Sequence, residues 1–173
     1  MTDARLLIRA AAPADLDAIA RIHTAARSAY YRGAVPDDVL ADPAAAARRR
    51  RILSQRMHDP RCTVLCAEAA GELAGFAILG PPLDQPAPDP ATGELRQIHV
   101  SPAQWRQGIG SELHNACVHV WRAASVRTGQ VDVWANNQRA RAFYARHGCR
   151  PAGGRRPGPA GADYLRLRLA IPR

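Results

Sequence analysis

The chain has 173 residues, of which 47% are hydrophobic and 23% charged, a balance typical of a globular protein and unlike that of a disordered chain. No run of 18 consecutive apolar residues occurs, and the first ten residues lack the apolar stretch of a secretory signal, so we expect a cytoplasmic protein without a membrane span. The net charge is +9, and all 24 basic residues are arginine. This charge indicates a general attraction to polyanions and only weakly favours a nucleic-acid partner. The length predicts a single domain over residues 1–173.

The cysteines form no CxxC pair and no Cys/His cluster with zinc spacing, so we expect no metal. Free, partly buried thiols in a reducing compartment are the simplest interpretation, and a disulfide is the alternative. The four residues are Cys62, Cys66, Cys117 and Cys149.

The first half of the chain predicts one strand and two helices. Residues 6–9 form a short strand, and Pro13 then begins a helix to about residue 27, since the missing N–H of proline costs nothing at a helix start. Glycine and prolines interrupt residues 28–43, and a second helix follows over residues 44–57. The arginine run 48–51 lies on this helix and covers a full turn, so it presents no single basic face to DNA.

The middle of the chain predicts a hairpin and a third strand. Strands over residues 63–67 and 72–79 are joined by Ala70-Gly71, a typical hairpin turn. The five prolines of residues 80–93 exclude a central strand there, and residues 95–100 form the next one.

The last part alternates helices and strands. We expect a helix over residues 110–127, a strand over 131–135, a helix over 138–147 and a strand over 164–170. The complete order predicts an α/β (α+β) fold in which helices cover the faces of a mixed sheet.

The segment from Ile98 to Leu113 is the first candidate site. A strand ends in it, a polar loop follows, and Gly108 and Gly110 flank the start of a helix. Glycines allow close approach of a ligand to the backbone, and free N–H groups at a helix start bind anions, so this loop is a candidate phosphate site. A plain strand-to-helix turn is the alternative, because the loop lacks both the GK[ST] of a Walker loop and the third glycine of a Rossmann loop.

The second candidate segment runs from Asn136 to Gly148. Asn137 can cap the helix that follows it, and Ala140, Phe143 and Tyr144 share one face of that helix. Core packing accounts for Phe143, whereas the phenol of Tyr144 could reach a ligand held by the first segment.

These two segments resemble the GNAT superfamily of N-acetyltransferases. Residues 105–110 resemble its acyl-CoA signature [QR]-x-x-G-x-[GA], although Trp105 occupies the first position. Cys149 likewise stands where phenylalanine is usual. The second segment resembles the family pattern N-x-x-A-x-x-F-Y-x-x-x-G, with the matching residues Asn137, Ala140, Phe143, Tyr144 and Gly148.

The resemblance implies a mostly antiparallel mixed sheet, splayed at its central strands, with acetyl-CoA as acyl donor between them and no metal. It implies an N-acetyltransferase that moves the acetyl group directly to a primary amine of a small molecule or peptide. The residues expected at acetyl-CoA are Ile98, His99, Val100, Trp105, Arg106, Gln107, Gly108, Ile109, Gly110, Ser111, Asn137, Ala140 and Phe143.

The resemblance also suggests two catalytic residues. Glu94 lies six residues before Val100, where some family members place a glutamate general base, and a solvated glutamate is the alternative. Tyr144 is the candidate acid for the departing thiolate. His99 could bind substrate or pack in the core, and His23 is expected to be structural.

The acceptor itself is not specified by the sequence. We expect residues 28–43 to shape its site, with Tyr30, Tyr31, Asp37 and Asp38 as candidate contacts. The two aspartates suggest a cationic acceptor, although exposed loop aspartates are common. The alternatives are a GNAT-like toxin that acetylates aminoacyl-tRNA, a catalytically silent CoA-binding regulator and a plain nucleic-acid-binding protein. The sequence leaves open whether the chain forms a homodimer.

Overall fold

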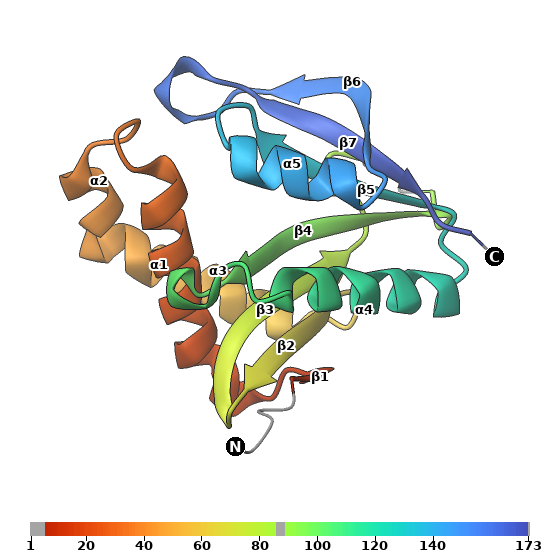
Figure 1. Cartoon of the computed structure of the whole chain (residues 1–173), viewed down its shortest axis with the longest axis horizontal. Helices are drawn as coiled ribbons and strands as arrows, with labels where there is room; N and C mark the ends of the chain where they lie inside the picture. The colour runs from red at the N-terminus through yellow and green to blue at the C-terminus, as the bar shows by residue number, and fades with distance from the viewer. Residues whose placement is uncertain (1–5, 86–88, 173) are drawn as a thin grey trace.

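The computed structural model describes residues 6–85 and 89–172, which form a mixed sheet with helices on both faces (Figure 1). In that part of the chain the sheet has seven strands in the order β1-β2-β3-β4-β5-β7-β6, and only β4 and β5 pair in parallel. The strands are β1 Leu7–Ala10, β2 Thr63–Ala69, β3 Glu72–Gly80, β4 Thr92–Val100, β5 Thr128–Trp134, β6 Arg150–Arg156 and β7 Tyr164–Ala170.

Two groups of helices cover the two faces. The first group is α1 Leu16–Tyr31, α2 Asp37–Ala41 and α3 Pro43–His58, and the second is α4 Ile109–Ala123 and α5 Gln138–Arg146. The buried residues Ile19 and Leu53, from α1 and α3, pack on Phe76 and Ile78 of β3. On the other face, α4 and α5 bury a larger apolar cluster with β4, β5 and β7. No helix of the described segments is long and apolar enough to cross a membrane.

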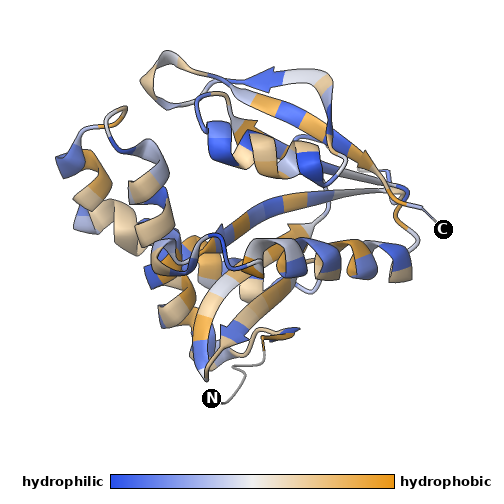
Figure 2. Ribbon diagram, viewed as in Figure 1, coloured by the Kyte–Doolittle hydropathy of each residue, from blue (hydrophilic) through white to orange (hydrophobic). Residues whose placement is uncertain are grey.

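The strand β4 has one apolar and one polar face. Leu95 and Ile98 pack in the cluster under α4, and both can do so because a β-bulge against β3 shifts the alternation between them. Figure 2 shows the resulting mixture of apolar and hydrophilic residues along β4. Glu94, Gln97 and His99 pair with Gly80, Ile78 and Phe76 of β3 respectively, and therefore share the sheet face on which α1 and α3 pack.

The sheet opens between its central strands. The parallel pairing joins only Thr92–Glu94 to Thr128–Gln130, and beyond these residues β4 stays with β3 while β5 stays with β7. Gly93 and Gly129 lie at this junction, where a Cβ on either would overlap the indole of Trp121 from α4. Glycine at both positions therefore lets Trp121 pack against the point at which the two halves of the sheet diverge.

The structure confirms most predicted elements and corrects several boundaries. The helix predicted over residues 110–127 ends at Ala123, and α1 extends to Tyr31, within the region expected to be broken. The strand β6 was missed because Pro151 and two glycines obscure its pattern, and all its residues are exposed. Cys62, Cys66, Cys117 and Cys149 are free thiols, as predicted.

Candidate active site

The loop that joins β4 to α4 presents backbone amides. Arg106 and Gly108 both have left-handed backbone conformations, with φ of 69° and 82°. Gly108 is the N-cap of α4, so the amides of Ile109 and Gly110 in the first helical turn have no carbonyl four residues back in the helix. Such a helix start attracts anions, and the loop thus has the features predicted for a phosphate site.

The side chain of Trp105 contacts β4 and α5. Its indole N–H donates to the carbonyl oxygen of Val100 at 2.8 Å, and the Arg139 guanidinium stacks 3.1 Å from its ring centroid. Trp105 thereby connects the end of β4 to the first turn of α5, across the opening between β4 and β5. The substitution of Trp for Gln or Arg at this signature position adds a contact between these two elements.

A second set of contacts joins α4 and α5. The hydroxyl of Ser111 lies 3.1 Å from Nε2 of His147, and Gly110 lies close enough to Phe143 that an added Cβ would just touch its ring. Because Gly110 has no side chain, the start of α4 and the ring of Phe143 approach one another closely. The residues predicted to surround the acyl donor are therefore neighbours.

The helix α5 is fixed at its start by the predicted cap. The side-chain oxygen of Asn137 accepts a hydrogen bond from the amide of Ala140 at 3.0 Å, which confirms the capping prediction. Tyr144, two turns later, is buried with 6% exposure and borders a small gap together with Leu95 and Gln130. Burial raises the pKa of its phenol, so Tyr144 remains protonated at neutral pH.

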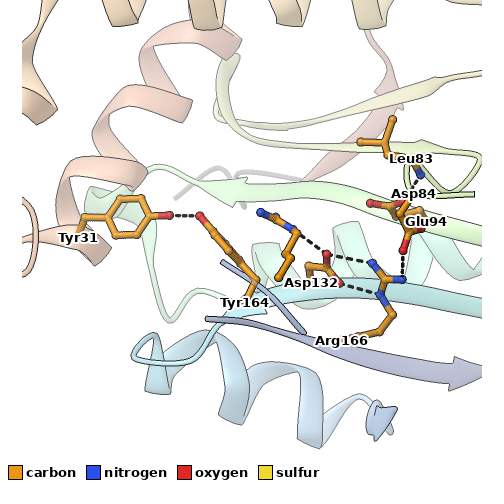
Figure 3. A network of polar contacts seen from close by, with 8 residues as sticks. Tyr31, Leu83, Asp84, Glu94, Asp132, Tyr164 and Arg166 are labelled. Carbon is orange, nitrogen blue, oxygen red and sulfur yellow. Dashed lines mark hydrogen bonds and ion pairs between the residues drawn. The ribbon is translucent and has the colours of Figure 1, made fainter. Parts of the chain in front are cut away.

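Glu94 lies on the opposite face of β4, next to Gln130 of β5 at the point where the sheet opens. Its side chain is 8% exposed, and its carboxylate accepts a hydrogen bond from the amide of Leu83 at 2.8 Å. Figure 3 shows Glu94 close to Leu83 and Asp84 of the loop after β3. Glu94 has no ion-pair partner among the described residues, whereas Asp132, on the same face of the sheet, pairs with Arg156 and Arg166.

By contrast, Asp132 of β5 is fully engaged by arginines. Arg166 of β7 donates to both its oxygens, at 2.8 and 3.1 Å, and Arg156 of β6 donates at 2.9 Å (Figure 3). Burial alone would raise the pKa of Asp132, but the hydrogen bonds from Arg166 and Arg156 outweigh it and lower the pKa. Arg166 also pairs with Asp84 and so holds the loop beside Glu94. Sequence reasoning missed this network.

Aromatic residues lie at the wide end of the opening. The hydroxyls of Tyr31 and Tyr164 contact each other and connect α1 to β7 (Figure 3), and the ring of Tyr31 packs edge-on against Trp134 of β5. Tyr30 stacks on His99 of β4, with ring centroids 6.1 Å apart. We name the face that carries Glu94, Gln97, His99, Asp132 and Trp134 the polar face.

His23 of α1 and His99 of β4 lie next to each other, and both imidazole rings are uncharged. Their rings lie 5.0 Å apart, and His23 is 7% exposed, in agreement with its predicted structural role. Burial, with the charges of Arg49 and Arg27, lowers the pKa of His23 to about 4. Burial also lowers the pKa of His99 well below its ordinary value, so both rings are uncharged at neutral pH.

Tyr30 and Tyr31, the candidate acceptor contacts, lie beside the polar face in the last turn of α1. Asp37 and Asp38 differ from them: they form the first turn of α2 and are exposed. Acidic residues at that position favour the helix through its dipole, and neither makes a hydrogen bond or ion pair with the described residues of the polar face.

Residues 19–149 match the model of the acetyltransferase (GNAT) family. The chain belongs to this family. The match covers most of the chain and includes both segments that carry the signature resemblance. Members of the GNAT family use an acyl-CoA donor, so the chain is an acyl-CoA-dependent acetyltransferase. None of the curated protein sequences matches this chain.

Solved acetyltransferase structures are similar to this fold over nearly its whole length. PaiA N-acetyltransferase of Thermoplasma acidophilum, in complex with coenzyme A, is 15% identical with a TM-score of 0.80, covering 96% of this chain and 99% of its own. YncA of Salmonella typhimurium, with acetyl-CoA, is 19% identical with a TM-score of 0.73 and coverages of 98% and 95%. The ribosomal-protein-alanine N-acetyltransferase of Brucella melitensis is 24% identical, with a TM-score of 0.73 and coverages of 95% and 99%.

The residues present fit an acyl-CoA donor. The amide-rich start of α4 suits a pyrophosphate, and the unpaired edges of β4 and β5 suit an extended amide-containing chain between them. Within residues 6–85 and 89–172, no group of three or more His, Cys, Asp or Glu side chains is placed to hold a metal ion.

Proposed function

We propose that the protein transfers the acetyl group of acetyl-CoA to a primary amine by direct transfer in a ternary complex. The observation that carries the proposal is the opening between β4 and β5, with the free amides of a helix start at one side and Glu94, a carboxylate without an ion pair among the described residues, at its narrow end. The proposal treats the whole chain as one acetyltransferase domain.

Acetyl-CoA would be bound mainly by backbone groups of the protein. The loop of residues 105–111 would bind the phosphates through amides of α4, and residues 98–100 of β4 would bind the pantetheine chain through theirs. Asn137 positions this side by fixing where α5 begins, and Phe143 packs against the start of α4. Acetyl-CoA supplies an activated acyl thioester at the centre of the opening.

Glu94 is proposed as the general base. An amine is protonated at neutral pH, and for a lysine-like amine the free form lies about 3 pK units away, or roughly 4–5 kcal/mol. A carboxylate near the reacting centre can accept this proton, directly or through one water. Glu94 suits the role better than Asp132, because the Asp132 oxygens already accept hydrogen bonds from two arginines.

Tyr144 is proposed as the general acid on the other side of the sheet. Its phenol is protonated because burial raises its pKa, so it can donate a proton to a departing thiolate. Glu94 and Tyr144 lie on opposite faces of the sheet but at the same position along β4. Leu95, which follows Glu94, and Gln130, which pairs with Glu94, both border the gap that Tyr144 lines. Proton removal from the amine and proton donation to the thiolate would thus take place on separate faces.

An amine-panel acetylation assay with purified protein, read as release of the CoA thiol, tests the proposal. We expect turnover with at least one class of primary amine and tight dependence on acetyl-CoA. Binding of acetyl-CoA without turnover on any amine would instead identify a silent regulator. Acetylation confined to charged tRNA, with strongly salt-dependent binding, would identify the toxin-like alternative.

A further inference from the structure

Two arginines beside the polar face lack the partners that their neighbours have. On α3, Arg48 pairs with Asp42 and Arg50 pairs with Asp17, whereas Arg49 between them is half-buried and has no ion pair among the described residues. Arg27 of α1 is also half-buried, and it likewise forms no ion pair there. The Nε atoms of both, and Nη2 of Arg49, are buried without a hydrogen-bond partner.

The two guanidinium groups lie close enough to affect one another. Burial and the charge of Arg27 lower the pKa of Arg49, and both charges contribute to the low pKa of His23. A buried guanidinium nitrogen without an acceptor is costly, and two neighbouring cations add repulsion to that cost. The nearby His23 and His99 are neutral and supply no negative charge.

This pair belongs to the side of the polar face from which an amine would approach. Arg27 lies 4.6 Å from the ring centroid of Tyr31, whose hydroxyl contacts Tyr164 across the opening. The loop after β3 occupies the narrow end beside Glu94. Glu94 thus lies at one end of this region, and Arg27 and Arg49, which form no ion pair with the described residues, lie at the other.

We infer that Arg27 and Arg49 bind an oxyanion of the acceptor, so that the acceptor is an amine that also carries a carboxylate, as an amino acid does. This inference rests on the proposed function. Arginine donors match carboxylate geometry, and an oxyanion would provide acceptors for the orphaned nitrogens and relieve the repulsion between the two charges. The inferred acceptor therefore carries a carboxylate as well as its ammonium group, whereas Asp37 and Asp38 suggested only a cationic acceptor.

Matched pairs of amines test the inference, because the second member of each pair lacks the carboxylate. We would compare alanine with alaninamide and 4-aminobutyrate with propylamine, using kcat/KM for acetyl transfer. The wild-type protein should prefer the carboxylate of at least one pair by tenfold or more. Arg49→Gln and Arg27→Gln should each reduce this ratio at least tenfold. Arg50→Gln, which removes an exposed arginine one residue away, should leave the ratio unchanged.

Two further measurements separate the possible failures. Calorimetric binding of N-acetylalanine and N-acetyl-4-aminobutyrate needs no turnover, so the inference can be tested even if no amine is acetylated; Arg49→Gln should weaken this binding at least tenfold. A wild-type protein that acetylates amines with no preference for carboxylates would overturn the inference and leave the function intact. Loss of acetyl-CoA affinity in Arg27→Gln or Arg49→Gln would also overturn it, because the pair would then serve the donor phosphates.

Discussion

The two sides of the opening between β4 and β5 are built from different kinds of interaction. On the donor side, the loop before α4 would act mainly through backbone amides, whose placement depends on glycines, a helix start and a cap. On the acceptor side, the polar face and its surroundings would act through side chains that come from α1, α3, β4, β5 and β7. A backbone site leaves a short local motif, whereas a side-chain site assembled from distant elements leaves none. This difference explains why the donor can be read from the sequence and the acceptor cannot.

Glu94→Gln should give the largest effect, and it tests the acceptor side. The amide cannot accept the amine proton, so we expect kcat to fall about 10²–10⁴-fold at pH 7. The deficit should shrink as pH rises, because more of the amine is then already deprotonated. A pH–rate profile of the wild-type protein and the variant checks this. Equal rates across the pH range would mean that Glu94 only accepts the hydrogen bond from Leu83 and takes no part in catalysis.

Tyr144→Phe should have the next largest effect, on the donor side. The change removes only the hydroxyl and keeps the ring in the core, where Tyr144 is 6% exposed. A thiolate is already a tolerable leaving group, so we expect kcat to fall on the order of 10²-fold, the low end of general acid catalysis. Acetyl-CoA affinity and thermal stability should stay close to wild type. A variant that loses stability but keeps its turnover would identify Tyr144 as a packing residue.

The donor side of the site could be predicted from the sequence, whereas the acceptor side could not. The two motifs predicted the loop around Gly108 and the Asn137 cap, because each of these features depends on residues only a few positions apart in the sequence. The pairing of Asp132 with Arg166 could not be predicted, since it requires the register of β5 against β7, 34 residues further along. The orphaned pair of Arg27 and Arg49 was also hidden, because a sequence does not show which arginines lack acids in space.

Gly129→Ala tests how much the stability of the fold depends on the junction at which β4 and β5 pair. A Cβ at Gly129 would overlap the ring of Trp121, so we expect a loss of about 1–3 kcal/mol in the free energy of unfolding, as is usual for overpacking. Chemical denaturation measures this loss. Gly71→Ala, at a turn position where a Cβ meets no neighbouring atom, is the control for the general cost of changing a glycine. It will carry only the backbone cost of a residue at φ of 80°. Unchanged stability in Gly129→Ala would contradict a specific role for the Trp121 contact.

Trp105→Phe should have the smallest effect, and it decides what the unusual residue at the signature position does. The change removes the indole N–H that donates to the Val100 carbonyl and keeps an aromatic ring on which Arg139 can stack. A partly buried hydrogen bond of this kind contributes about 0.5–1.5 kcal/mol to stability, so the melting temperature should fall by only a few degrees. Acetyl-CoA affinity should change less than threefold, because backbone amides of the loop would still bind the phosphates. An affinity loss of tenfold or more would mean that the indole itself contacts the donor.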